Sequence, residues 1–76
     1  MIETDEIVAL GFFYDEETSI IASGRVFMND KCSMGIDRYG VVRIHKETEG
    51  FYERVFEDFV EDLPELIIRL REWNAL

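Results

Sequence analysis

Few side chains in this 76-residue sequence could do chemistry at neutral pH. His45 is the only histidine, and so the only side chain of the usual kind for acid–base catalysis near pH 7. Ser19, Ser23 and Ser33 are available hydroxyls, but none lies in a nucleophile-elbow sequence. We therefore predict that His45 is an ordinary, partly exposed strand residue and that the protein is not an enzyme.

Metal and thiol chemistry are similarly limited. Cys32 is the only cysteine, so no disulfide can form within the chain. A structural zinc site needs about four Cys or His ligands, and Cys32 and His45 are the whole supply. Apolar neighbours at alternate positions, Met34 and Ile36, predict a buried structural cysteine. We expect no metal and no cofactor.

The most pointed feature is a run of acidic side chains opposed by Arg54 alone. Its members are Glu53, Glu57, Asp58, Glu61, Asp62 and Glu65. In a helix, like charges four positions apart repel by a few tenths of a kcal/mol, so a helix built only for stability would intersperse lysines. Two interpretations stay open: a solvated face that keeps the domain soluble, or a surface that presents negative charge to a basic groove.

A second acidic group could join that surface. It consists of Asp15, Glu16 and Glu17. These residues lack the loop spacing and the glycine of an EF-hand calcium site. A solvated acidic turn is the alternative reading of the group.

The whole chain is acidic, with 17 Asp and Glu against 8 Lys and Arg and a formal charge of −9. This charge opposes direct binding to nucleic acid, whose affinity comes from Lys and Arg on phosphates, and to anionic membranes. No uncharged stretch approaches the roughly 20 residues that span a bilayer. The acidic start is unlike a secretory signal, and a lone cysteine suits a reducing compartment. The sequence predicts a cytoplasmic protein with a basic protein partner.

The hydrophobic pattern predicts four strands in the first two thirds of the chain. Residues 6–14 and 19–28 are rich in β-branched and aromatic side chains. Residues 32–37 alternate between apolar and polar, and residues 41–46 pair back on them through a turn closed by Gly40. Short connections between sequential strands make an antiparallel meander.

From Thr48 onward the apolar residues recur at helical spacing. The stripe consists of Phe51, Tyr52, Val55, Phe56, Phe59, Val60 and Leu63. Pro64 cannot lie inside this helix without the loss of a hydrogen bond, so Asp62 to Glu65 predict the start of a second helix. A single kinked helix over 49–75 is the alternative. The predicted fold is one α+β domain spanning 1–76, a four-stranded meander with two C-terminal helices on one face (ββββαα).

The first two predicted strands leave apolar residues such as Leu10 and Phe12 on the face away from the helices. A chain this short buries only roughly 60% of the surface its unfolded form exposes. We therefore add the hypothesis that the second face is buried in a homodimer.

In size, acidity and lack of a catalytic motif, the chain is similar to the small inhibitors that phages make against host nucleases, including anti-CRISPR proteins and other DNA mimics. The similarity is one of profile and covers no alignable motif. It implies a non-catalytic inhibitor that occludes a basic, nucleic-acid-binding site on another protein. The alternative function is a structural or assembly module, either a homodimer or a small subunit of a larger complex.

Overall fold

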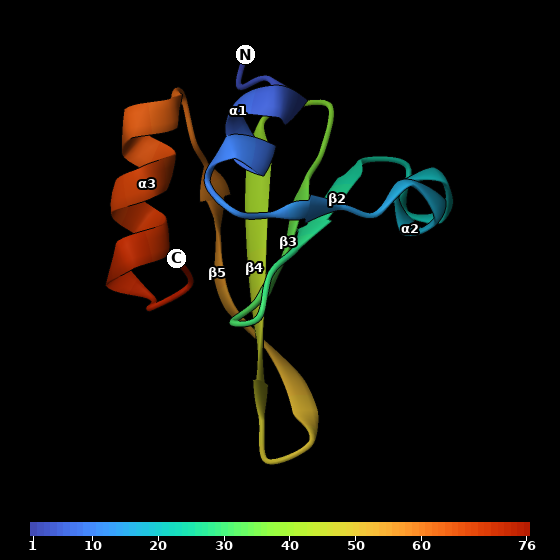
Figure 1. The fold of residues 1–76 in the computed structure, drawn as a ribbon, viewed down its shortest axis with the longest axis vertical. Coiled ribbons are helices and arrows are strands. Elements are labelled where there is room, and N and C mark those ends of the chain that lie inside the picture. The colour runs from blue at the N-terminus through green and yellow to red at the C-terminus, as the bar shows by residue number, and fades with distance from the viewer.

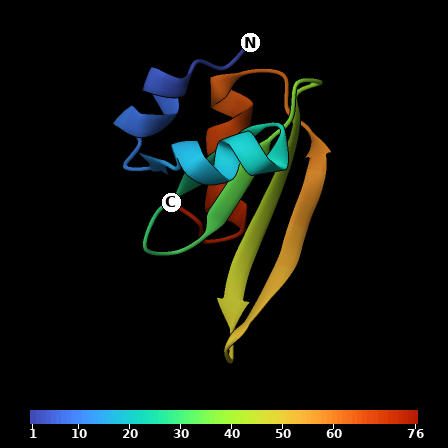
Figure 2. The same ribbon diagram turned by 90° about the vertical axis from the view of Figure 1, so that its right-hand side faces the viewer.

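A computed structural model describes all residues, 1–76, as five strands and three helices. In chain order these are α1 (Thr4–Ala9), β1 (Phe13–Tyr14), α2 (Glu16–Ala22), β2 (Arg25–Met28), β3 (Ser33–Ile36), β4 (Val41–Thr48), β5 (Phe51–Phe59) and α3 (Leu63–Glu72). The strands form one antiparallel sheet in the order β1-β2-β3-β4-β5 (Figure 1). In Figure 2, α2 lies in front of the sheet and α3 behind it.

The predicted order ββββαα is therefore wrong, first in residues 6–14, which were expected to form a strand. The N-terminal half of this segment belongs to α1, and only two residues pair as β1. A short helix forms because the Glu6 carboxylate accepts the N–H of Glu3 at 3.0 Å and closes the first turn. Ile7 points into the core while Val8 is exposed. The apolar residues that had suggested a strand with two buried faces therefore include a short helix with one buried side.

The second predicted strand, residues 19–28, is half helix. The Asp15 carboxylate accepts the N–H and the hydroxyl of Thr18 at 3.1 and 2.8 Å and caps α2. The hydroxyl of Ser19 then accepts the N–H of Val26 at 2.8 Å and ties α2 to β2. A cap at Asp15, rather than a turn, explains why the strand begins later than predicted.

The largest correction concerns the helix that was expected from Thr48 onward. The chain instead makes a two-residue turn at Glu49 and Gly50, both with positive φ (53° and 85°), and returns as β5. Ile44 lies opposite Phe56 and His45 opposite Arg54, so Val55 is an unpaired bulge residue between them. Apolar pairs four residues apart fit a helical stripe, but they also fit a strand in which a bulge resets the alternation.

Two local predictions are confirmed. Residues of β3 and β4 form a hairpin whose turn contains Gly40 at φ 88°, and the Asp37 carboxylate accepts the N–H of Tyr39 at 2.8 Å. A C-terminal helix begins where Asp62 and Pro64 predicted, because Asp62 Oδ1 accepts the N–H of Glu65 at 3.0 Å. It is the only helix after the sheet, so neither two C-terminal helices nor a kinked one forms.

The core lies between one face of the sheet and the helices α1 and α3. Its buried side chains are Ile2, Ile7, Phe12, Phe27, Cys32, Met34, Ile36, Val42, Ile44, Val60, Leu66, Leu70 and Ala75. Phe12 is buried and Leu10 packs against the same core. The two residues expected on a spare dimer face are therefore part of the monomer core.

The last residues of the chain are fastened to the sheet by polar contacts. Lys46 Nζ donates to the carbonyls of Trp73 and Asn74 at 3.0 and 2.8 Å. Asn29 Nδ2 donates to the carbonyl of Ala75 at 2.8 Å. These donors satisfy the carbonyls of the three residues that follow α3, and they fasten this segment to β4 and to the β2–β3 loop.

Candidate functional site

Strand β5 forms the outer edge of the sheet and pairs only with β4. Figure 2 shows no element beyond it, because the helices lie over the two faces. The N–H of Val60 donates to the carbonyl of Gly40 at 3.1 Å, so the N–H groups of Glu57 and Phe59 point away from β4. Asp58 Oδ1 accepts the N–H of Phe59 at 2.7 Å, whereas the N–H of Glu57 faces solvent.

Most of the predicted acidic residues follow this edge, on a strand and a helix start rather than on a helix face. Glu53 and Asp58 are exposed on β5, Glu61 follows it, and Asp62 and Glu65 lie at the start of α3. Residues 47–65 hold eight carboxylates and one arginine, a local charge of −7 within the −9 of the chain. The negative charge is therefore concentrated along one side of the molecule.

Glu57 is a predicted site residue whose negative charge is neutralised by ion pairs within the chain. Its carboxylate accepts from Arg43 Nε at 2.5 Å and from Arg54 Nη1 at 3.3 Å. The hydrogen bond from Arg43 holds the pKa of Glu57 below its usual value. Arg43 also contacts Asp37 at 3.2 Å. Glu57 thus belongs to a chain of ion pairs across β4 and β5.

The second acidic group lies elsewhere. Asp15, Glu16 and Glu17 are at the start of α2, which contacts β2 near the opposite edge of the sheet from β5. The hydrogen bonds from Thr18 lower the pKa of Asp15. The structure therefore does not bring these three acids together with those of β5, and Asp15 acts as a helix cap.

Two aromatic side chains at the tip of the β4–β5 hairpin were missed as site candidates. Phe51 is 77% exposed and Tyr52 is 62% exposed. The tip extends beyond both helices in Figures 1 and 2. Gly50 between two runs rich in β-formers was a signal for a hairpin in the sequence, but the prediction of a helix from Thr48 onward overlooked it.

We call the combined region the β5 edge surface. It consists of Glu49, Phe51, Tyr52, Glu53, Asp58, Phe59, Glu61, Asp62 and Glu65. The carboxylates of this surface form no salt bridge within the chain, so together with the exposed aromatic rings they present negative charge and apolar area at one protruding edge.

His45 is a partly exposed strand residue, as predicted, on the sheet face opposite Ile44, and it faces Ser33 across the β3–β4 pair. Burial and the charges of Arg54 and Arg43 lower the pKa of His45. Arg54 Nε approaches His45 Nε2 at 3.5 Å, and no carboxylate is hydrogen-bonded to the ring. The surroundings disfavour the protonated form of this histidine, and no carboxylate orients the ring as a base for Ser33.

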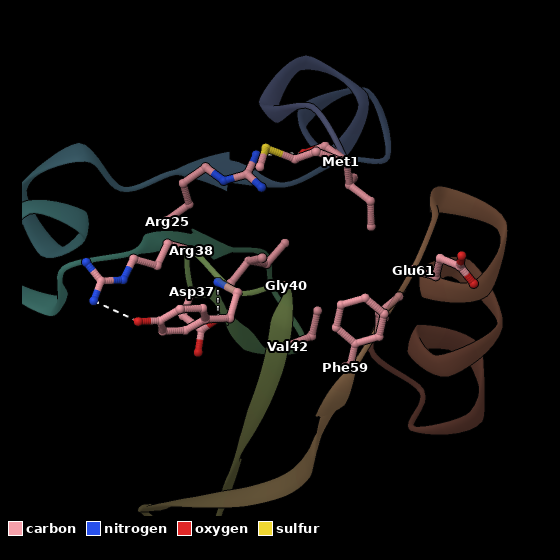
Figure 3. Close-up of a pocket in the computed structure, with 12 residues that line it drawn as sticks. Met1, Arg25, Asp37, Arg38, Gly40, Val42, Phe59 and Glu61 are labelled. Atoms are coloured by element: carbon pink, nitrogen blue, oxygen red, sulfur yellow. Dashed lines mark hydrogen bonds between the residues drawn. The ribbon is translucent and has the colours of Figure 1, made fainter.

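A hollow of about 200 Å³ opens at one end of the sheet, beside the β3–β4 turn. Figure 3 shows Met1 and Arg25 on one side of it and Gly40 and Phe59 on the other. Sites for small molecules usually enclose about 300–1,000 Å³. Arg25 Nη1 is already bonded to the carbonyl of Ile2 at 2.8 Å. The hollow is thus small, and its cationic group is engaged in holding the N-terminal segment.

Cys32 is buried, as predicted, and its Sγ contacts the carbonyl of Ala75 at 3.6 Å. Burial raises the pKa of its thiol to about 11.

No three His, Cys, Asp or Glu side chains are arranged to hold a metal ion. None of the helices has the length and apolar character needed to cross a bilayer. No protein family, curated protein or solved structure matches this chain.

Proposed function

We propose that the protein is a non-catalytic inhibitor whose β5 edge surface docks on a basic, nucleic-acid-binding surface of another protein and occludes it. The observation that supports this proposal is the local charge of −7 over residues 47–65, a segment that includes β5, the strand with no neighbour on its outer side. Glu53 and Asp58 form no salt bridge within the chain, in contrast to Glu57. Their charge is available to a partner.

Charge and aromatic side chains would contribute differently to this docking. Carboxylates on the edge attract a basic surface at long range and raise the rate of association, an effect that salt screens. Phe51 and Tyr52 at the tip would supply apolar contact area. Buried anchors of this kind contribute most of the binding energy of an interface. A phosphate backbone and this edge would compete for the same cationic groups.

The test is a pair of charge reversals with the same change in net charge. Glu53→Lys/Asp58→Lys alters the β5 edge surface, and Asp5→Lys/Asp30→Lys alters exposed acids on α1 and the β2–β3 loop. The probe is an octalysine peptide, measured by fluorescence anisotropy at about 50 and about 300 mM salt. A single-stranded DNA oligonucleotide serves as the competitor for the peptide.

We expect the native protein to bind octalysine, to compete with the oligonucleotide, and to lose affinity with added salt. The β5 pair should lose about tenfold or more in affinity and the control pair no more than about threefold. Equal losses in both would mean that only net charge matters, and this would overturn the proposed site.

A second candidate function, an assembly module, is favoured by a different feature. Ile20 and Ile21 on α2 are 76% and 84% exposed, which is unusual for adjacent isoleucines in a small domain. Ile20→Ser/Ile21→Ser should then abolish self-association seen by sedimentation and leave octalysine binding unchanged. Monomeric native protein at tens of micromolar would exclude the homodimer form of this candidate.

A further inference from the structure

The outer backbone of β5 offers hydrogen-bonding groups over nine residues. Phe51 and Thr48 flank a two-residue turn, and residues in these positions bond to each other, so the backbone of Tyr52 points outward. The alternation directs the N–H of Arg54 outward as well, and because the bulge at Val55 shifts the alternation by one residue, the N–H of Glu57 also points outward. Natural proteins usually shorten or cover such an edge, because it is a template for another strand.

We infer that an extended basic segment of the partner adds to β5 as a sixth strand of the sheet. This inference rests on the proposed function for the sign of the partner's charge. It goes beyond that function by stating the conformation of the bound segment and the backbone groups that hold it. Main-chain hydrogen bonds would give the affinity, and the side chains of β5 would select the sequence.

Charge decides between the two occupants that could pair with this edge. A second copy of the chain would bring another local charge of −7 against the first, and like charges directly opposed on adjacent strands are destabilising. A basic segment places cations opposite Glu53 and Asp58 instead. Directly opposed side chains on adjacent strands have Cβ atoms about 5 Å apart, within reach of an ion pair.

The register of β5 also predicts the pattern of the bound segment. Glu53 lies opposite Lys46 and Asp58 opposite Val42, on the face that α3 covers. Tyr52 and Phe59 lie on the other face. The complementary segment therefore alternates, with Lys or Arg on the α3 side and apolar residues on the open side.

Asp58 couples charge recognition to strand pairing. Its carboxylate covers the outward N–H of Phe59 at 2.7 Å. A cationic side chain that pairs with Asp58 would draw the carboxylate away from this N–H and free it for the incoming strand. A neutral extended segment would leave the donor covered, so the edge discriminates against uncharged strands.

The experiment compares three alternating peptides with a flexible one of equal charge. The first is acetylated (Lys-Val)₄ amide, and two derivatives carry N-methyl groups on either the lysine or the valine amides. The fourth peptide is (Lys-Gly)₄. Binding is measured by fluorescence anisotropy, and amide hydrogen exchange by NMR reports on Tyr52, Arg54 and Glu57.

We expect (Lys-Val)₄ to bind about tenfold or more tightly than (Lys-Gly)₄ and to slow exchange at the three β5 amides. Because a strand uses only one of its edges, one N-methylated derivative should lose about tenfold or more in affinity and the other should keep it. This asymmetry has no counterpart in binding by charge alone.

Three other outcomes would contradict the inference, and each is distinguishable from the others. Equal binding of all four peptides without protection of β5 overturns strand addition but leaves the proposed function standing, provided that Glu53→Lys/Asp58→Lys still weakens binding. Failure of every peptide to bind at low salt overturns both. Protection of the β5 amides in the free protein, together with a dimer in sedimentation, would assign the edge to a second copy and contradict the inference.

Discussion

Arg43 on β4 and Glu57 on β5 face each other directly across the open side of the sheet, with Nε and Oε2 2.5 Å apart. Arg54 adds a contact to Glu57 at 3.3 Å, and Asp37 holds the other end of Arg43 at 3.2 Å. All four side chains are partly exposed, so each pair contributes modestly to stability. Their joint effect is to align β5 with β4.

The first prediction concerns acid stability. The hydrogen bond from Arg43 lowers the pKa of Glu57 below its ordinary 4.5, so ionised Glu57 stabilises the fold above that pH. This contribution is lost as pH falls through the folded pKa. Below pH 4.5, the urea midpoint of the native protein should fall more steeply than that of Glu57→Gln. Parallel curves would contradict the role given to Arg43.

The second prediction concerns His45, whose pKa is lowered from 6.5 by burial and by the charges of Arg54 and Arg43. The unfolded chain then binds the proton more readily than the folded one, so stability is complete above pH 6.5 and declines as pH falls below it. His45→Gln should flatten this decline. An imidazole titration by NMR should give a midpoint below 6.5, and a midpoint above it would refute the prediction.

The third prediction compares two glycines with positive φ, Gly40 at 88° and Gly50 at 85°. A Cβ at Gly40 would lie 2.8 Å from Phe59 Cε2, whereas a Cβ at Gly50 meets nothing within 4 Å. Alanine at Gly50 should cost about 1–2 kcal/mol from backbone strain alone, and alanine at Gly40 more. Urea denaturation should show the excess disappearing in a Phe59→Ala background; a persistent excess would rule out the ring contact.

The fourth prediction separates the two roles of Asp62, which caps α3 by accepting the N–H of Glu65. Asp62→Ala should lower the free energy of unfolding by about 1 kcal/mol, and Asp62→Asn by only a few tenths, since asparagine caps as well as aspartate. Both variants remove the same charge. Thermal denaturation should therefore distinguish them while octalysine binding should not.

The fifth prediction uses the thiol of Cys32. Burial raises its pKa to about 11, so little thiolate exists at neutral pH. A disulfide reagent should modify the native protein slowly, at the rate at which the core opens, and the urea-unfolded protein at once. Rapid modification of the native protein would show that the thiol is accessible.

The parts of the fold that the sequence predicted correctly are those determined by neighbours in the chain. The hairpin turn at Gly40 and the start of α3 at Asp62 depend on residues within four positions of one another. The cap at Asp15 and the capping box of Glu3 and Glu6 are just as local. Their signals were present in the sequence and were outweighed by the apolar content of the following residues.

Strand β5 was mispredicted for a different reason. A helical stripe and a bulged strand produce the same apolar spacing, and only the pairing with β4 decides between them. The site depends on the same long-range pairing, because Arg43 neutralises Glu57 from fourteen positions away in the sequence. The acidic composition of residues 47–65 was predictable, but the free edge and the exposed ring of Phe51 follow from tertiary structure.

The bulge at Val55 also determines which of two pairing registers the β4–β5 hairpin adopts. If Val55 entered the ladder opposite His45, the distal strands would slip by one position, and Arg54 would oppose Lys46. The observed register instead sets Glu53 against Lys46. Because like charges opposed across a ladder are unfavourable, the slipped register is disfavoured and these side chains select the observed alignment of the two strands. Exchanging Lys46 with Glu47 would remove this selection.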